Sequence, residues 1–184
     1  MNSKYALTGG PGAGKTTLLN SLAARGYRVV PESARQIIQT RLSQSLPPRS
    51  EPTIFANEIL RKDIAQYRRY DTENGEPMFY DRGVLDALYM LDVVSALSRT
   101  SIANYVREFE YNRQVFLLPP WEEIYCTDSE RDQTFEEAVA VFEGMKRWYT
   151  LWGYQAVEVP RVDVARRCEF ILDTVHQAFG RLQR

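Results

Sequence analysis

Hydrophobic residues follow two alternating patterns along the chain: short apolar runs, and longer segments with apolar residues every three or four positions. The short runs lie at residues 5–7, 27–32, 77–83, 114–118 and 155–159, and their length is that of β-strands buried in a sheet. The periodic segments lie at residues 16–24, 34–42, 53–70, 84–94, 101–111, 134–152 and 162–182, and their spacing predicts amphipathic helices. Strands therefore alternate with helices through the whole chain.

This alternation predicts an α/β fold with three layers, in which helices cover both faces of a central parallel sheet of about five strands. In such folds, ligands bind at the carboxyl ends of the strands. The sequence contains no internal repeat, low-complexity tract or interdomain linker, so we expect a single domain over residues 1–184.

Composition narrows the class of protein. The 184 residues are 44% hydrophobic and 26% charged, a balance typical of a soluble globular domain. The 23 Lys and Arg residues nearly cancel the 24 Asp and Glu residues, so no net field attracts nucleic acid or anionic membranes. Cys126 and Cys168 are far apart, which suggests neither a disulfide framework nor a zinc site. We expect a cytoplasmic protein that binds neither nucleic acid nor membrane.

The stretch TGGPGAGKTT at residues 8–17 fits the pattern G-x-x-x-x-G-K-[ST] in full. Its glycines permit a curled backbone whose amides converge on one anion, and the helix that follows adds its positive end. Lys15 would reach the β and γ phosphates of ATP, and Thr16 would give a hydroxyl to Mg²⁺. We call residues 9–17 the phosphate loop and predict that all of them bind the nucleotide: Gly9, Gly10, Pro11, Gly12, Ala13, Gly14, Lys15, Thr16 and Thr17.

Asp81 follows the apolar residues Met78, Phe79 and Tyr80, which places its carboxylate at a strand end near the phosphates. We predict that it is a second Mg²⁺ ligand, and the alternative is that it caps the helix starting at residue 84. Many motor ATPases have a glutamate directly after this aspartate to polarise water, but this chain has Arg82. A cation there suits binding of a phosphate or substrate oxygen.

Glu32 ends the second predicted strand, within the stretch PESAR. Its carboxylate could act as a general base that orients an acceptor hydroxyl, or it could be an N-terminal carboxylate of the helix at residue 34. Both interpretations remain open. Arg35 could bind a substrate phosphate or pair with Glu32, and the pairing is slightly favoured.

At GGPGAGKTT, VVPESAR and FYDRG the chain resembles the P-loop kinase and AAA-type predicted ATPase family, whose relatives include ribosylnicotinamide kinase and deoxynucleoside kinase domains. The resemblance covers most of the chain and implies that Glu32 is the base and that Arg82 binds substrate or phosphate. It also implies a lid at residues 119–134 with Arg131 as its only arginine, and an adenine wall at Pro160 in the loop at residues 159–163.

Two functions fit these features. The preferred one is a Mg-ATP-dependent kinase that phosphorylates a hydroxyl or phosphate on a nucleoside-like or other small metabolite. Its catalytic residues would be Lys15, Glu32, Asp81, Arg82 and Arg131. The alternative is an ATPase that acts as a nucleotide-dependent switch or adaptor for a partner protein, and the acidic predicted lid with its single arginine favours this second function.

Overall fold

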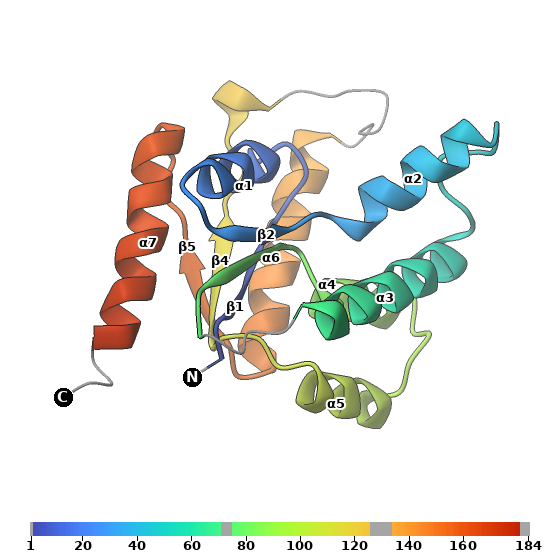
Figure 1. Cartoon of the computed structure of the whole chain (residues 1–184). Helices are drawn as coiled ribbons and strands as arrows, with labels where there is room; N and C mark the ends of the chain where they lie inside the picture. Colours follow the sequence, from blue (N-terminus) through green and yellow to red (C-terminus); the bar gives the residue numbers. More distant parts are fainter. Residues whose placement is uncertain (1, 71–74, 126–133, 181–184) are drawn as a thin grey trace.

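The computed structural model describes residues 2–70, 75–125 and 134–180, and its centre is a five-stranded sheet (Figure 1). The strands are β1 (Lys4–Gly9), β2 (Arg28–Val30), β3 (Met78–Asp81), β4 (Gln114–Leu118) and β5 (Gln155–Glu158). They lie in the order β2-β3-β1-β4-β5, and every adjacent pair is parallel. The predicted α/β fold with five parallel strands is confirmed.

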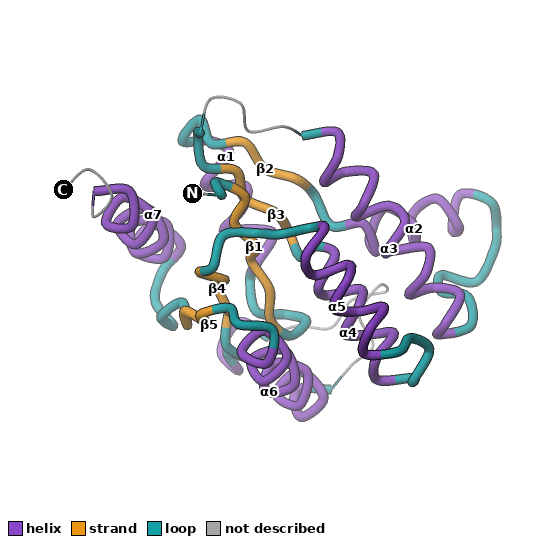
Figure 2. Tube along the Cα trace, turned by 90° about the horizontal axis from the view of Figure 1, so that it is seen from below, coloured by secondary structure: helices purple, strands orange, loops and turns teal. Residues whose placement is uncertain are grey.

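Helices cover both faces of this sheet. They are α1 (Lys15–Ala24), α2 (Ser33–Ser43), α3 (Pro52–Arg69), α4 (Val84–Val93), α5 (Arg99–Glu108), α6 (Phe135–Leu151) and α7 (Val164–Gly180), with a short 3₁₀ helix η1 (Glu122–Ile124). In Figure 2, α7 lies on one side of the strands, and α3, α4 and α5 lie on the other. In the part of the chain that the structure describes, no helix has the length and apolarity needed to cross a membrane.

Two hydrophobic cores result, because successive side chains of a strand point to opposite faces. Tyr5 and Leu7 of β1 pack with residues of α1 and α7, among them Leu18 and Ile171. Ala6, between them, packs on the opposite face with residues of α3, α4 and α6. Burial on both faces explains why the strands are nearly continuous apolar runs in the sequence.

The strand order brings the ends of β1 and β3 together. β1 lies between β3 and β4, and in the sheet register Leu7 pairs with Asp81 while Gly9 pairs with Leu118. The phosphate loop leaves β1 at this edge, so it starts beside Asp81. Ligands of open α/β sheets bind where neighbouring strand connections diverge in this way.

Gly9 shows how closely the phosphate loop approaches β4. Its φ is 138°, and a Cβ at this position would overlap the carbonyl oxygen of Leu118. We predict that Gly9→Ala lowers the free energy of unfolding by about 3 kcal/mol or more, because the backbone of the loop or of β4 must move to make room for the methyl group. The measurement is urea denaturation followed by circular dichroism.

Gly26→Ala is the matched control for this substitution. Gly26 also has a positive φ, 91°, but nothing lies within 4 Å of its would-be Cβ. Its loss should be about 1 kcal/mol, from backbone strain alone. Equal losses for the two variants would show that the approach of β4 does not constrain Gly9.

Candidate active site

The phosphate loop connects β1 to α1 and turns through glycines with positive φ. Gly12 has φ 71° and Gly14, the N-cap of α1, has φ 79°. Lys15 is buried, and its Nζ donates hydrogen bonds to the carbonyl oxygens of Gly10 (2.8 Å) and Gly9 (3.3 Å). Residues 12–17 and Arg35 line a cavity of about 180 Å³. We call it the phosphate cavity, because loop amides, a lysine and a helix N-terminus suit an anion there.

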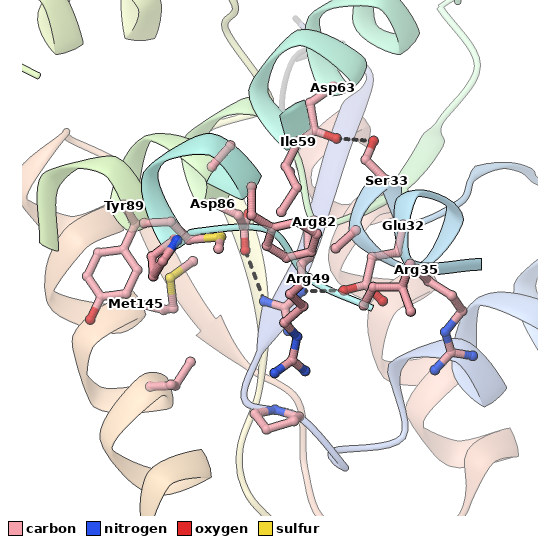
Figure 3. A pocket seen from close by; sticks show the side chains of 18 of the residues that line it. Glu32, Ser33, Arg35, Arg49, Ile59, Asp63, Arg82, Asp86, Tyr89 and Met145 are labelled. Carbon is pink, nitrogen blue, oxygen red and sulfur yellow. Dashed lines mark hydrogen bonds and ion pairs between the residues drawn. The ribbon is translucent and has the colours of Figure 1, made fainter. Parts of the chain in front are cut away.

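Arg82 links two carboxylates at the end of β3. Its side chain is 22% exposed, and it donates from Nε to Glu32 Oε1 (3.1 Å) and from Nη1 to Asp86 Oδ1 (3.3 Å), as Figure 3 shows. Its backbone is left-handed, with φ 67°, and its amide donates to the Leu7 carbonyl oxygen. A strained non-glycine conformation of this kind persists only when surrounding contacts determine it, and such strain often occurs at functional sites.

Asp86 extends this network to the centre of the sheet and to α6. Its Oδ1 also accepts a hydrogen bond from the Thr8 hydroxyl, and its Oδ2 accepts one from Tyr149 OH at 2.7 Å. Asp86 is not among the site residues predicted from the sequence. A signal was present, since an acid inside the strongly apolar helix segment VLDALYML needs polar partners when it is buried.

Glu32 is the N-cap residue of α2, yet its side chain makes no capping hydrogen bond and pairs with Arg82 instead. Burial would raise the pKa of Glu32, but the positive charges of Arg82, Lys15 and Arg35 outweigh it and lower the pKa. Glu32 therefore does lie at the N-terminus of α2, as the second interpretation placed it, but its side chain does not cap the helix by a hydrogen bond. The positive charge of Arg35 contributes to this lowering of the Glu32 pKa, as expected for two side chains that interact favourably.

Asp81 lies buried at the end of β3, and its Oδ1 has no hydrogen-bond partner among the described residues. Gly83 is the N-cap of α4, and the first amide of this helix, that of Val84, donates to Tyr111 OH at 3.2 Å rather than to Asp81, so the capping alternative for Asp81 is wrong. Burial and the negative charge of Glu32 raise the pKa of Asp81 to about 6. An orphaned buried carboxylate oxygen beside a phosphate loop fits a divalent cation, with Thr16 on the first turn of α1 as the other predicted protein ligand.

A second, larger cavity of about 370 Å³ adjoins the phosphate cavity, because Lys15 and Arg35 line both. Glu32, Arg82 and Asp86 lie at its polar side, as Figure 3 shows. Its apolar wall comes from α2, α3, α4 and α6 and includes Ile38, Phe55, Ile59, Met90, Val141 and Met145. A cavity of this size and mixed lining suits a small organic molecule.

Asp63 of α3 also lines this larger cavity. It is not among the site residues predicted from the sequence. It is 5% exposed, its Oδ1 accepts a hydrogen bond from Ser33 Oγ at 2.5 Å, and its Oδ2 has no partner among the described residues. Burial raises the pKa of Asp63 to about 7. The hydrogen bond from Ser33 lowers this pKa and the negative charge of Asp86 raises it, but both effects are smaller than that of burial. The available signal was an acid four positions after Ile59 on the buried side of an amphipathic helix.

Pro160 lies farther along the same edge of the sheet. Pro160 is half-buried in the loop after β5, and this loop is tied to the one after β4 because Arg161 Nε donates to the Pro120 carbonyl oxygen at 2.8 Å. Arg131 and half of the predicted lid, residues 126–133, lie outside the described residues. The structure thus brings Lys15, Glu32, Arg35, Arg82 and Asp81 together, and their catalytic and binding roles stay predictions.

Comparisons with known proteins agree with this architecture. A family model described as AAA domain matches residues 4–167, and a search of curated proteins finds no match. Deoxyadenosine kinase from M. mycoides with bound dATP has a similar structure, with 16% identity, a TM-score of 0.64 and coverage of 95% of this chain and 99% of that chain. The same enzyme with the products dCMP and dCDP has a TM-score of 0.67 at 16% identity and the same coverage. At this identity the likeness shows a shared fold.

Asp63 predicts an unusual pH dependence of stability. Its pKa is about 7 in the folded protein against an ordinary value of 3.8, so the folded state binds more protons than the unfolded state between these values. Stability is then highest below the ordinary pKa and falls, by at most roughly 4 kcal/mol, as the pH rises to 7. Asp63→Asn should flatten this fall and make the protein more stable than wild type at pH 8.

The measurement is urea denaturation of both proteins across this pH range. Asp92→Asn is the control, because Asp92 is on α4 and forms a surface ion pair with Arg99 at 3.8 Å; it should keep the wild-type profile. If the profiles of Asp63→Asn and wild type run parallel, the Asp63 carboxyl does not titrate near pH 7.

Proposed function

We propose that this chain, which belongs to the AAA domain family, is a Mg-ATP-dependent kinase that transfers the γ-phosphate to a hydroxyl or phosphate of a nucleoside-like or other small metabolite. The observation that supports this most is the pair of adjoining cavities, one formed by the phosphate loop and one large enough for an organic acceptor, which share Lys15 and Arg35. The fold shared with deoxyadenosine kinase, which has been solved with bound dATP, adds support.

On the donor side, the amides of the phosphate loop and Lys15 bind the triphosphate. The two loop carbonyls that now accept from Lys15 Nζ would give way to phosphate oxygens. Thr16 and Asp81 would hold Mg²⁺, which neutralises charge on the β and γ phosphates. No three acidic, cysteine or histidine side chains in the described ranges form a metal group. Phosphates and water would supply the other ligands, as Mg²⁺ commonly requires. The loop containing Pro160 would contact the adenine.

On the acceptor side, Glu32 orients the attacking hydroxyl. Its lowered pKa keeps the carboxylate ionised, so it can accept the hydroxyl proton as a hydrogen bond. In a loose phosphoryl-transfer transition state this proton leaves late, and the carboxylate therefore helps mainly by alignment. Arg82 fixes Glu32 and binds the acceptor, and Arg35, at the junction of the cavities, contacts the phosphate in transfer. Arg131 would add positive charge from the lid.

The alternative switch function differs in where the phosphate goes. In the sequence, an arginine rather than a glutamate follows Asp81, and the structure engages that arginine with two carboxylates. Neither contact prepares a water molecule for attack. A simple switch also needs no site for an organic acceptor, so the large cavity favours the kinase.

A label-transfer experiment tests the proposal directly. The protein is given γ-labelled ATP, Mg²⁺ and a pool of nucleosides and other hydroxyl-bearing metabolites, and the label is followed by chromatography and mass spectrometry. We expect label on an organic acceptor. Label that appears only as free phosphate, at a rate unaffected by the pool and raised by a protein partner, would support the switch function instead.

Glu32→Gln tests the role of the base. The amide can still accept a hydrogen bond from Arg82, but it has no negative charge with which to align the acceptor hydroxyl and receive its proton late in the reaction, so turnover with the acceptor should fall at least about 100-fold while the Kd for ATP stays unchanged. Steady-state kinetics and calorimetry give the two quantities.

Glu108→Gln is the matched control, because this glutamate pairs with Arg68 on the surface and its side chain is 56% exposed. It should leave turnover and ATP affinity at wild-type values. Wild-type turnover in Glu32→Gln would remove Glu32 from the mechanism.

A further inference from the structure

Arg167 of α7 is a buried cation that has no acidic partner among the described residues. It is 3% exposed, and within residues 2–70, 75–125 and 134–180 its Nε has no hydrogen-bond partner and no ion pair includes it. Burial lowers the pKa of Arg167. Burial of a cation without a carboxylate partner costs free energy in the free protein, which a bound anion would recover.

The contacts of Arg167 point to the phosphate loop. Its Nη1 donates to the Ala13 carbonyl oxygen at 3.2 Å, and its guanidinium carbon lies 4.7 Å from the ring centroid of Trp121. The guanidinium therefore lies between the loop and an aromatic ring. It contacts the loop from outside the phosphate cavity, since Arg167 is not among the residues that line this cavity.

Peptide geometry connects this contact to the nucleotide. The described part of the chain has no cis peptide bond, and in a planar trans peptide the C=O and the following N–H point in opposite directions. When Arg167 holds the Ala13 carbonyl toward α7, the amide of Gly14 must point to the opposite side, where Ala13 and Gly14 line the phosphate cavity. A side chain at Gly14 would also crowd this contact, since its Cβ would lie 3.1 Å from Arg167 Nη1.

We infer that Arg167 is a positioning residue for the donor nucleotide. Arg167 turns the Ala13–Gly14 peptide so that the Gly14 amide faces the phosphates, and the bound polyphosphate complements the charge of Arg167. The inference rests on the nucleotide-binding part of the proposed function and does not require transfer to an acceptor. The competing explanation is that Arg167 only attaches α7 to the loop. The two explanations predict different effects of removing Arg167 on the stability of the free protein. If Arg167 only attaches α7 to the loop, its removal destabilises the free protein; if its charge is compensated only by bound nucleotide, its removal does not.

The test measures the unfolding temperature, by differential scanning calorimetry without and with MgATP, and the Kd for MgATP by titration calorimetry. Arg167→Met removes charge and hydrogen bond while keeping length, and Arg167→Lys keeps the charge. Arg166→Met is the control, because Arg166 is the preceding residue, its side chain is 74% exposed and its ion pair is with Asp163 on the surface.

We expect Arg167→Met without nucleotide to unfold at or above the temperature of Arg166→Met, to lose most of the shift produced by MgATP, and to bind MgATP about tenfold more weakly. Arg167→Lys should recover most of the affinity, and Arg166→Met should match wild type. Should Arg167→Met fail to fold, unfold below Arg166→Met without nucleotide, or bind MgATP with wild-type Kd, the inference is overturned. If wild type itself shows no shift with MgATP, the nucleotide site and the proposed function fail as well.

Discussion

The largely buried guanidinium of Arg82 is the contact on which the arrangement of the site depends. It joins Glu32, at the start of α2, to Asp86 on α4, and Asp86 in turn bonds Thr8 of β1 and Tyr149 of α6. One cation therefore relates four segments at the carboxyl edge of the sheet. Removing one member would leave the others buried without compensation, and buried networks of this kind hold a single geometry for that reason.

Arg82 also explains why neighbouring carboxyl groups differ in charge. Glu32 receives a direct ion pair and a lowered pKa, whereas Asp81 and Asp63, which burial dominates, have pKa values of about 6 and about 7. Environments that move pKa values apart assign separate roles to chemically similar groups. Asp81 and Asp63 each also have one oxygen that finds no partner in the part of the chain that the structure describes. The free protein thus gives up stability at atoms that a cation or an acceptor can satisfy, a common relation between activity and stability.

Features made by contiguous residues could be predicted from the sequence. The run QVFLL at residues 114–118 coincides with β4, and the phosphate loop connects a strand to a helix as its glycines and Lys15 imply. Glu32 and Asp81 could be expected at one edge because parallel strands end together. Each of these conclusions needs only local spacing and the rule that alternating strands and helices form a parallel sheet.

The sequence by itself thus determined the fold class, the phosphate loop and the acidic and basic residues at the strand ends. Only the tertiary structure decided that the Glu32 side chain pairs with Arg82 rather than capping α2. It also added two residues that were not predicted: Asp63, which lines the large cavity, and Arg167, which reaches the loop carbonyl 154 positions earlier. These outcomes depend on the rotation and packing of helices. Packing sets which side chains lose water and which partners replace it, and local spacing carries no information about contacts between distant segments.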